Sequence, residues 1–184
     1  MRKKSHLSLA GYIVDVVDAD MIDHPLAFRF GSLEPDLVPT FITTKHRIDL
    51  TFHKLEKKIN KVIDEYDKNK GMTIGLSKDL GVITHYIADY FTFPHNQIYD
   101  GNLKDHCVYE KELKFRLREY VKSGKAFCDR IDAKKFETPE AVCSFVKKAH
   151  EDYLKMKHGV QEDCEYIVRI CHQVVQAILN LVNL

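Results

Sequence analysis

Apolar residues recur at helical spacing through most of the chain, and this periodicity constrains the fold more than any other feature. In a lysine- and glutamate-rich segment, Leu55, Ile59, Val62, Ile63 and Tyr66 follow one another at spacings that place most of them on one face of a helix. Convincing alternation of apolar and polar residues, typical of half-buried strands, does not occur. The sequence therefore predicts an all-α protein of about six to seven helices.

The same periodicity predicts helices over roughly 7–18, 77–92, 104–122, 138–156 and 160–182. Ser77 is placed like an N-cap, and Thr138 precedes Pro139 and Glu140 in the order of a cap and a first turn. Glycine, proline and asparagine collect in loops at 23–45, 67–76, 93–103 and 123–137. We expect a single domain over residues 1–184, with a long irregular segment from Asp23 to Lys45.

Composition excludes several classes of protein. Lys and Arg number 28 against 27 for Asp and Glu, so no net charge indicates a nucleic-acid partner. The longest apolar stretch, 167–184, is interrupted by Arg169 and other polar residues, which excludes a transmembrane segment. It predicts a core helix or the face of a possible homodimer. The basic start, residues 1–4, lacks a signal-peptide cleavage site downstream, so we expect a cytoplasmic protein.

The five cysteines indicate reduced, mostly structural thiols. Their number is odd and no two form a CxxC pair, which argues against a disulfide framework and a thiolate zinc site. Cys107 is next to His106 but is expected to point away from the helix face that carries His106 and Glu110. The cysteines are Cys107, Cys128, Cys143, Cys164 and Cys171.

Histidines and carboxylates form the strongest local signal. His85 and Asp89 are four residues apart on a predicted helix, so an imidazole and a carboxylate share one face. Pro94 ends that helix and brings His95 toward the same neighbourhood. His106 and Glu110 repeat the spacing on the next predicted helix. This arrangement predicts a site for divalent metal ions, with zinc as the best candidate.

Each of these residues also has a purely structural interpretation that does not involve a metal ion. Ten histidines and 27 acidic residues make about one or two His-x3-acid pairs expected by chance, and ordinary surface pairs have this spacing. A third pair, His158 and Glu162, is treated as accidental because Gly159 breaks the helix there. Asp36 is held between Pro35 and Pro39 in a stiff segment, although a turn aspartate is the alternative. His6 precedes an apolar stripe, where a capping or core histidine is common.

The order and spacing of these residues resemble the motifs of the zinc-dependent phospholipase C family, whose fold is shared with P1-type nucleases. The resemblance covers roughly residues 5–110 and rests on His85-x3-Asp89-x5-His95, then His106-x3-Glu110. A histidine near the N-terminus and Gly31-x3-Pro35-Asp36 precede these motifs. The family implies up to three zinc ions in a central cleft among the helices, although other divalent metals are possible.

The resemblance also implies roles for individual residues. His85, Asp89, Asp36 and a downstream histidine would hold a first zinc; His46 is the first choice and His53 the competitor. Asp89 would bridge to a second zinc, held by His6 and the amine of Met1, and His95, His106 and Glu110 would hold the third. Met1 stands where secreted members have a processed residue, often tryptophan, and the chain contains no tryptophan.

The implied activity is phosphodiester hydrolysis of the phospholipase C type, in which zinc-bound hydroxide attacks phosphorus and Asp36 accepts a proton. The substrate would be a small phosphodiester or a phospholipid head group. A single-strand nuclease and a non-catalytic zinc-binding module are the alternatives. Aromatic residues near the motifs would line a cleft or belong to the core, which is the commoner outcome: Tyr86, Tyr90, Phe91, Phe93 and Tyr99.

Overall fold

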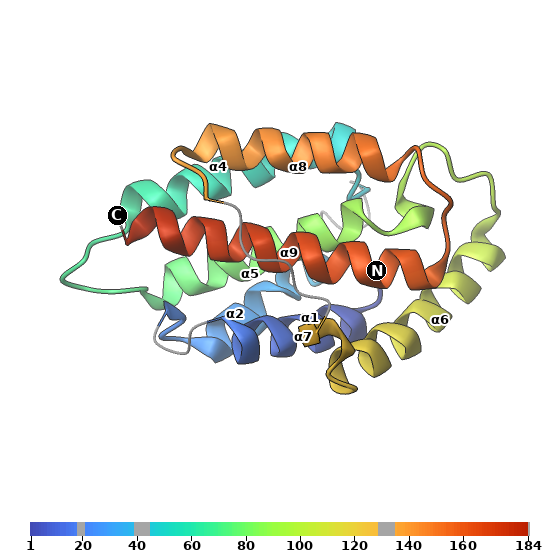
Figure 1. Cartoon of the computed structure of the whole chain (residues 1–184), viewed down its shortest axis with the longest axis horizontal. Helices are drawn as coiled ribbons and strands as arrows, with labels where there is room; N and C mark the ends of the chain where they lie inside the picture. The colour runs from blue at the N-terminus through green and yellow to red at the C-terminus, as the bar shows by residue number, and fades with distance from the viewer. Residues whose placement is uncertain (18–20, 39–44, 129–134, 184) are drawn as a thin grey trace.

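The computed structural model describes residues 1–17, 21–38, 45–128 and 135–183. In these ranges the chain forms helices joined by turns and loops, and the one isolated bridge there pairs Asp67 with Gly71, so the all-α prediction is confirmed. The helices are α1 (Lys3–Val16), α2 (Pro25–Gly31), η2 (Glu34–Asp36), α4 (Ile48–Glu65), α5 (Ile74–Tyr90), η3 (Phe93–His95), α6 (Leu103–Lys122), α7 (Lys125–Cys128), α8 (Pro139–Tyr153) and α9 (Val160–Val182) (Figure 1).

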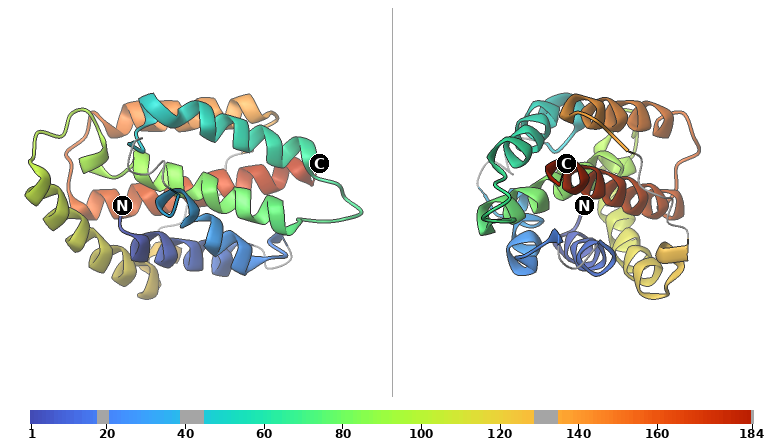
Figure 2. Two further views of the ribbon diagram at one scale, coloured as in Figure 1. Left: turned by 180° about the vertical axis from the view of Figure 1, so that it is seen from behind. Right: turned by 60° about the vertical axis from the view of Figure 1, so that its left-hand side comes forward.

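The helices surround a central pair, α5 and α9. Helices α4 and α8 lie on one side of this pair, and α1 and α2 lie on the other (Figures 1 and 2). Helix α6 packs against α1 and α9 and forms one flank of the molecule. Helix α5 contacts α1, α2, α4 and α9, so it is enclosed by neighbours in several directions.

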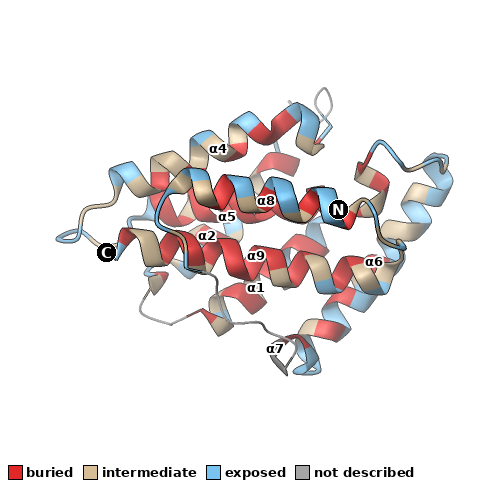
Figure 3. Ribbon diagram, turned by 45° about the horizontal axis from the view of Figure 1, so that its top comes forward, coloured by how far each residue is buried: buried red, intermediate tan, exposed pale blue. Residues whose placement is uncertain are grey.

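Helix α5 is buried on nearly every side because most of its residues are apolar or small, and its two aspartates, Asp79 and Asp89, both have charged partners. From Leu76 to Tyr90 every residue except Lys78 is buried (Figure 3), as expected for a core helix. The helix starts earlier than predicted: Thr73 is the N-cap, and its side chain accepts a hydrogen bond from the amide of Leu76. The N-cap prediction for Ser77 was therefore wrong, and Ser77 is a buried residue of the first turns.

Two glycines allow α2 to lie against α5 at backbone distance. A Cβ atom on Gly81 would lie 2.1 Å from the carbonyl oxygen of Phe28, and one on Gly31 would lie 2.0 Å from that of Lys78. Any larger residue would force the helices apart, because real Cβ contacts are never that short. This close approach brings Ser32 and η2, which follow α2, directly beside α5.

The sequence predicted the long helices more accurately than the short ones. Helix α9 spans the predicted 160–182, and Thr138 caps α8 by accepting from the amide of Ala141, with Pro139 in the first turn. The long irregular segment was partly wrong, since α2 and η2 lie in it; residues 39–44 are outside the described part. A helix as short as α2, with only Phe28 and Gly31 buried, is too short to show a period.

The described cysteines and the apolar character of the described helices agree with what the sequence predicts. Cys107 is exposed and Cys143, Cys164 and Cys171 are buried, all with free thiols; the side chain of Cys128 is outside the described part. Among the described residues, no helix combines the length and the apolar character needed to cross a membrane.

Candidate metal centre

Four buried side chains from three parts of the chain meet beside α5. Asp36 comes from η2, His46 precedes α4, and His85 and Asp89 lie one turn apart on α5. One donor atom from each lies within 4.8 Å of all the others. His46 Nδ1 is 2.9 Å from both Asp89 Oδ2 and His85 Nε2, and His85 Nε2 is 3.7 Å from Asp36 Oδ1. We call these residues the buried group.

The close contact between α2 and α5 orients His85. Its Nδ1 donates a hydrogen bond of 2.8 Å to the carbonyl oxygen of Ser32. Because a carbonyl only accepts, Nδ1 carries the proton and the neutral ring leaves Nε2 as a lone-pair donor. Nε2 is the atom that faces Asp36, His46 and Asp89. Backbone-to-histidine contacts of this kind fix the tautomer of metal-binding imidazoles.

Each carboxylate of the buried group has a second oxygen that faces His6, away from His46. Asp89 Oδ1 lies 2.6 Å from the amine of Met1 and 3.4 Å from His6 Nε2, and Asp36 Oδ2 lies 3.9 Å from His6 Nε2. The ring of His6 stacks on that of His85, with centroids 3.9 Å apart. Asp36 and Asp89 therefore each present one oxygen to His46 or His85 and the other oxygen to His6.

A second group lies beyond Met1 and is partly open to solvent. His106 and Glu110 come from one face of α6, and His95 comes from η3. Glu110 Oε1 lies 3.2 Å from a ring nitrogen of each histidine. The side chains of His95, His106 and Glu110 are 14, 29 and 16% exposed, unlike those of the buried group. The amine of Met1 connects both groups, because it lies 3.0 Å from His95 Nε2 and 3.3 Å from Glu110 Oε1. We call the three side chains the open group.

Burial and neighbouring charges set the protonation of these side chains. Burial lowers the pKa of His6 to about 3, and burial together with the Met1 amine lowers the pKa of His95, so both rings are neutral at pH 7. Burial opposes ionisation of Asp89, but the Met1 amine and nearby imidazoles outweigh it and hold its pKa well below the usual value. At Asp36 burial prevails and raises the pKa. Asp36 is thus the better proton acceptor.

Asp163, on the first turn of α9, supports the open group from behind. Its carboxylate accepts hydrogen bonds from the amide of Phe93 at 2.8 Å and from the hydroxyls of Tyr109 at 2.8 Å and Tyr153 at 2.6 Å. Phe93 begins η3, which carries His95, and Tyr109 precedes Glu110 on α6. One buried carboxylate therefore connects both elements of the open group. No local motif marks Asp163, so sequence reasoning missed it.

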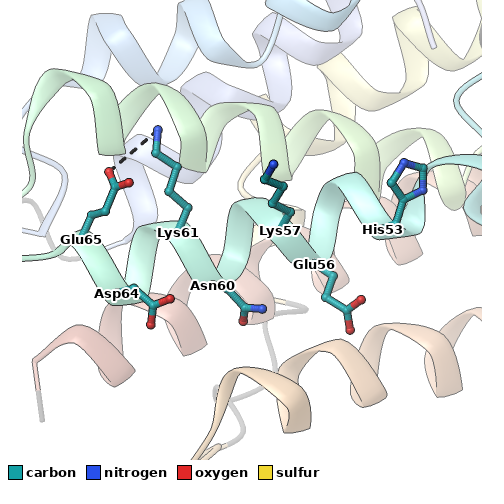
Figure 4. A pocket seen from close by; sticks show the side chains of 7 residues that line it. All are labelled: His53, Glu56, Lys57, Asn60, Lys61, Asp64 and Glu65. Atoms are coloured by element: carbon teal, nitrogen blue, oxygen red, sulfur yellow. Dashed lines mark ion pairs between the residues drawn. The ribbon is translucent and has the colours of Figure 1, made fainter.

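Other candidate residues lie elsewhere. His53 is exposed on α4, among residues such as Glu56 and Lys57 that point outward from the helix (Figure 4). His158 lies in the loop before α9 and stacks on Phe93, with ring centroids 4.4 Å apart, so it is not part of either group. Gly159 is the N-cap of α9, which agrees with the predicted break.

The aromatic residues divide between core and site. Tyr90 and Phe91 are fully buried in the core. Tyr86 is also buried, but its ring contacts those of His46 and His85, at centroid distances of 5.3 and 5.8 Å. Tyr99 is partly exposed, and its ring centroid lies 6.2 Å from that of His106. Tyr99 and Tyr86 are the aromatic residues nearest to the two groups among those considered.

The donor chemistry fits zinc. Tetrahedral zinc with bonds of about 2.0–2.1 Å places neighbouring donors about 3.3 Å apart. In the buried group, the donor nitrogens of His46 and His85 lie 2.9 to 3.9 Å from each other and from the facing oxygens of Asp36 and Asp89. Neither ring nitrogen of His6 has a hydrogen-bond partner in the described part of the chain, although the ring is buried. An unpaired buried imidazole is costly, and a metal ion would satisfy it.

An all-α fold with histidines and carboxylates gathered in two groups, and no cysteine in either group, belongs to a class of proteins that could hold metal ions suited to hydrolytic chemistry. The comparison with known families narrows this class: a family model described as zinc dependent phospholipase C matches residues 5–160. The chain belongs to the zinc-dependent phospholipase C family. The match continues through α8, well beyond the last histidine of the open group. Searches among curated proteins and solved structures gave no match.

Proposed function

We propose that the protein is a zinc-dependent phosphodiester hydrolase of the phospholipase C type. It would convert a phosphodiester and water into a phosphomonoester and an alcohol. The observation that carries the proposal is the divided use of Asp36 and Asp89, whose two oxygens face different nitrogen donors. Carboxylates placed in this way hold adjacent metal ions, the arrangement used for in-line displacement at phosphorus. Membership of the family supports the same reaction.

The proposed ligands fall into three sets. The buried group, Asp36, His46, His85 and Asp89, would hold one ion. The Met1 amine and His6, with Asp89 as the bridge, would hold a second, and the second oxygen of Asp36 also faces His6. The open group, His95, His106 and Glu110, would hold a third. His46, rather than His53, is the histidine that we assign to the first set.

The protein's own residues would then position and deprotonate the attacking water. Bound zinc supplies a positive field that lowers the pKa of water and neutralises phosphate charge. The Ser32 carbonyl accepts the Nδ1 proton of His85, so the neutral ring would present Nε2 to the ion. Asp36, whose pKa burial raises, would accept the proton of the attacking water. Solvent reaches the open group more easily than the buried group, so substrate would approach from the side of His106.

We propose a small phosphodiester or a phospholipid head group as the substrate, with Tyr99 beside His106 as a candidate contact for the leaving group. A single-strand nuclease and a non-catalytic zinc module remain the alternatives. Net charge of +1 gives no support to a nucleic-acid substrate.

The test combines metal content with turnover. Untagged protein is analysed for bound metal and assayed on p-nitrophenylphosphorylcholine, bis(p-nitrophenyl) phosphate and single-stranded DNA. We expect hydrolysis of at least one small diester, lost on chelation and restored by zinc. Asp36→Asn should reduce kcat by about 100-fold or more, whereas Asp152→Asn, on the exposed face of α8, should leave it unchanged. Bound metal without turnover on any diester would reject catalysis, and cleavage of DNA alone would favour the nuclease.

Three broader expectations stay predictions. We propose one domain over residues 1–184, supported by a single cluster of buried apolar residues that runs from Met1 to Val182. The cytoplasmic location and the homodimer expected from the sequence are both untested. Analytical ultracentrifugation of purified protein would measure the oligomeric state directly.

A further inference from the structure

Helices α1 and α6 form a surface hollow of about 470 Å³ on the flank of the molecule. The two helices pack against each other on the side opposite α4 and α8 (Figures 1 and 2). Cationic and apolar side chains line the hollow together with Ser8, and no carboxylate is among its lining residues. We call the following residues the α1/α6 face: Lys4, Leu7, Lys114, Phe115, Arg118 and Lys122.

The register of α6 gathers several of its cations on one stripe that carries no acidic residue. Lys111, Lys114, Phe115, Arg118 and Lys122 recur at helical spacing on the stripe that faces outward beside α1. The acids of the same segment, Glu112 and Glu119, lie on another stripe, where both pair with Arg116 at 3.9 and 3.7 Å. In the described part of the chain, none of the cations of the α1/α6 face has an ion pair within 4 Å.

Neighbouring residues strengthen this positive field. The charged groups that act most on Lys114 are all cations: Arg2, Lys4, Lys111 and Arg118. Partial desolvation and these like charges lower the pKa of Lys114. The whole chain has a formal charge of only +1, so these six or so cations are a local concentration rather than a general property.

Apolar side chains stand among the cations. Leu7 is 44% exposed and Phe115 is 55% exposed, and Val108 on the same helix is 58% exposed. The ammonium of Lys114 lies 4.0 Å from the centroid of the Phe115 ring. Cations beside exposed apolar side chains are typical of surfaces that lie in the interface of an anionic membrane, where lysine meets phosphate and the apolar groups enter the acyl boundary.

The occupant follows from this combination. A second copy of the chain docking the same face would bring like charges together, which disfavours it. Nucleic acid would match the cations but would gain little from Leu7 or Val108. We propose that the α1/α6 face docks the protein on a membrane surface that contains anionic phospholipid. The face begins beside the metal centre, because Arg2 follows Met1 and donates to the carbonyl of Cys107, the neighbour of His106.

Vesicle binding tests this proposal without requiring turnover, so its outcome is independent of the proposed hydrolysis. Binding is measured by cosedimentation with phosphatidylcholine vesicles and with phosphatidylcholine–phosphatidylserine vesicles mixed at roughly 7:3. We expect wild-type protein to bind the anionic vesicles, more weakly as salt rises, and to bind the neutral vesicles at least about tenfold more weakly.

Variants assign the binding to this face. Lys114→Glu with Arg118→Glu should reduce binding about tenfold or more, and Lys114→Gln with Arg118→Gln should reduce it less. Lys57→Glu with Lys70→Glu makes the same charge change at two exposed positions, one in α4 and one after it, and should bind like wild type. Leu7→Ser with Phe115→Ser should weaken binding while keeping its salt dependence. Circular dichroism confirms that each variant is folded.

Several results would overturn the proposal. Equal binding to neutral and anionic vesicles would exclude an electrostatic surface. Equal losses in the α6 and α4 variants would show a dependence on net charge alone. Binding that survives both the glutamate and the glutamine variants would place the contact elsewhere, including at the metal centre. Capture of a single-stranded oligonucleotide by wild type but not by the α6 variants, without vesicle binding, would assign the face to nucleic acid.

Discussion

His85 Nδ1 donates a hydrogen bond to the carbonyl oxygen of Ser32 where α2 and α5 approach each other at backbone distance. The carbonyl can reach the ring only because Gly81 lets α2 approach α5 at backbone distance. A side chain added at position 81 would therefore disturb the orientation of His85, a proposed metal ligand, without contacting its ring.

Replacement of Gly81 by alanine tests this dependence. The added methyl group would overlap the backbone of Phe28, so Gly81→Ala should lower the free energy of unfolding by about 1–3 kcal/mol and reduce bound zinc. The matched control is Gly75→Ala in the first turn of the same helix, where a Cβ atom meets only the Thr73 hydroxyl oxygen at 3.8 Å. Gly75→Ala should be neutral or slightly stabilising. Similar denaturation midpoints for both variants would show that the contact is not tight.

An extension before Met1 tests the amine as a ligand. The Met1 amine is buried and lies within 3.3 Å of Asp89, His95 and Glu110. A Gly-Ser extension converts it to an amide, so the extended protein should bind one zinc ion fewer than protein with a free Met1 amine. Elemental analysis gives the ratio, and a C-terminal tag of similar length is the control. Unchanged metal content in the extended protein would remove Met1 from the ligand set.

Asp89→Asn tests the bridging role. Asparagine keeps the shape but offers one oxygen in place of two, so it can no longer serve both sides equally. We expect loss of one ion with retention of another, measured by elemental analysis. Complete retention of metal would contradict the bridge, since Asp89 lies close to Met1, His6 and His46 at once.

Asp163→Ala tests support of the open group. The change removes the acceptor shared by the Phe93 amide and the Tyr109 hydroxyl. Loss of hydrogen bonds that orient metal ligands typically weakens metal binding by about 10–100-fold. Competition with a chelator measures the affinity. Tyr153→Phe removes the third hydrogen bond to the same carboxylate from α8, away from the proposed ligands, and should change zinc affinity much less. Equal affinities in Asp163→Ala and wild type would argue that the open group needs no such support.

His150 should make stability depend on pH. Its Nε2 donates to Asn96 Oδ1 at 2.7 Å, and burial lowers its pKa from 6.5 to about 4. Between these values the unfolded chain binds more protons than the native one, so this contribution is complete above pH 6.5 and is lost as the pH falls to 4. The loss should reach about 3 kcal/mol. In His150→Gln, which keeps a donor but does not titrate, urea unfolding should show a correspondingly smaller fall over this range; parallel curves would contradict the assignment.

Local patterns predicted the parts of this structure that depend on local physics. The period of α9 and the cap at Thr138 were sufficient because one apolar face and one hydroxyl decide them. His85 and Asp89 share a helix face for the same reason. By contrast, α2 is too short for its apolar residues to show a helical period. The start of α5 was predicted one turn too late, at Ser77, whereas Thr73 is the N-cap.

The site as a whole depends on contacts that no spacing encodes. Asp36, His46 and His6 reach α5 from separate segments, and only their order in the family resemblance connected them. Three contacts could not be predicted from the sequence, because each depends on how the helices pack. They are the approach of Asp36 Oδ2 to His6, the hydrogen bond of His85 to the Ser32 carbonyl, and the hydrogen bond of the Phe93 amide to Asp163. Packing depends on small details such as Gly31 and Gly81, whose neighbours are distant in sequence.

The proposed donors of the candidate metal centre extend from Met1 to Glu110. They lie at the amine of Met1, in α1, η2, α5, η3 and α6, and in the segment before α4. A chain whose described cysteines are all reduced has no covalent ties between these segments. Bound ions would supply that connection, joining positions more than a hundred residues apart in the way that disulfides join small secreted domains. Metal supply would then decide how long the folded protein lasts in the cell, because ions that bind only the native state add directly to its stability.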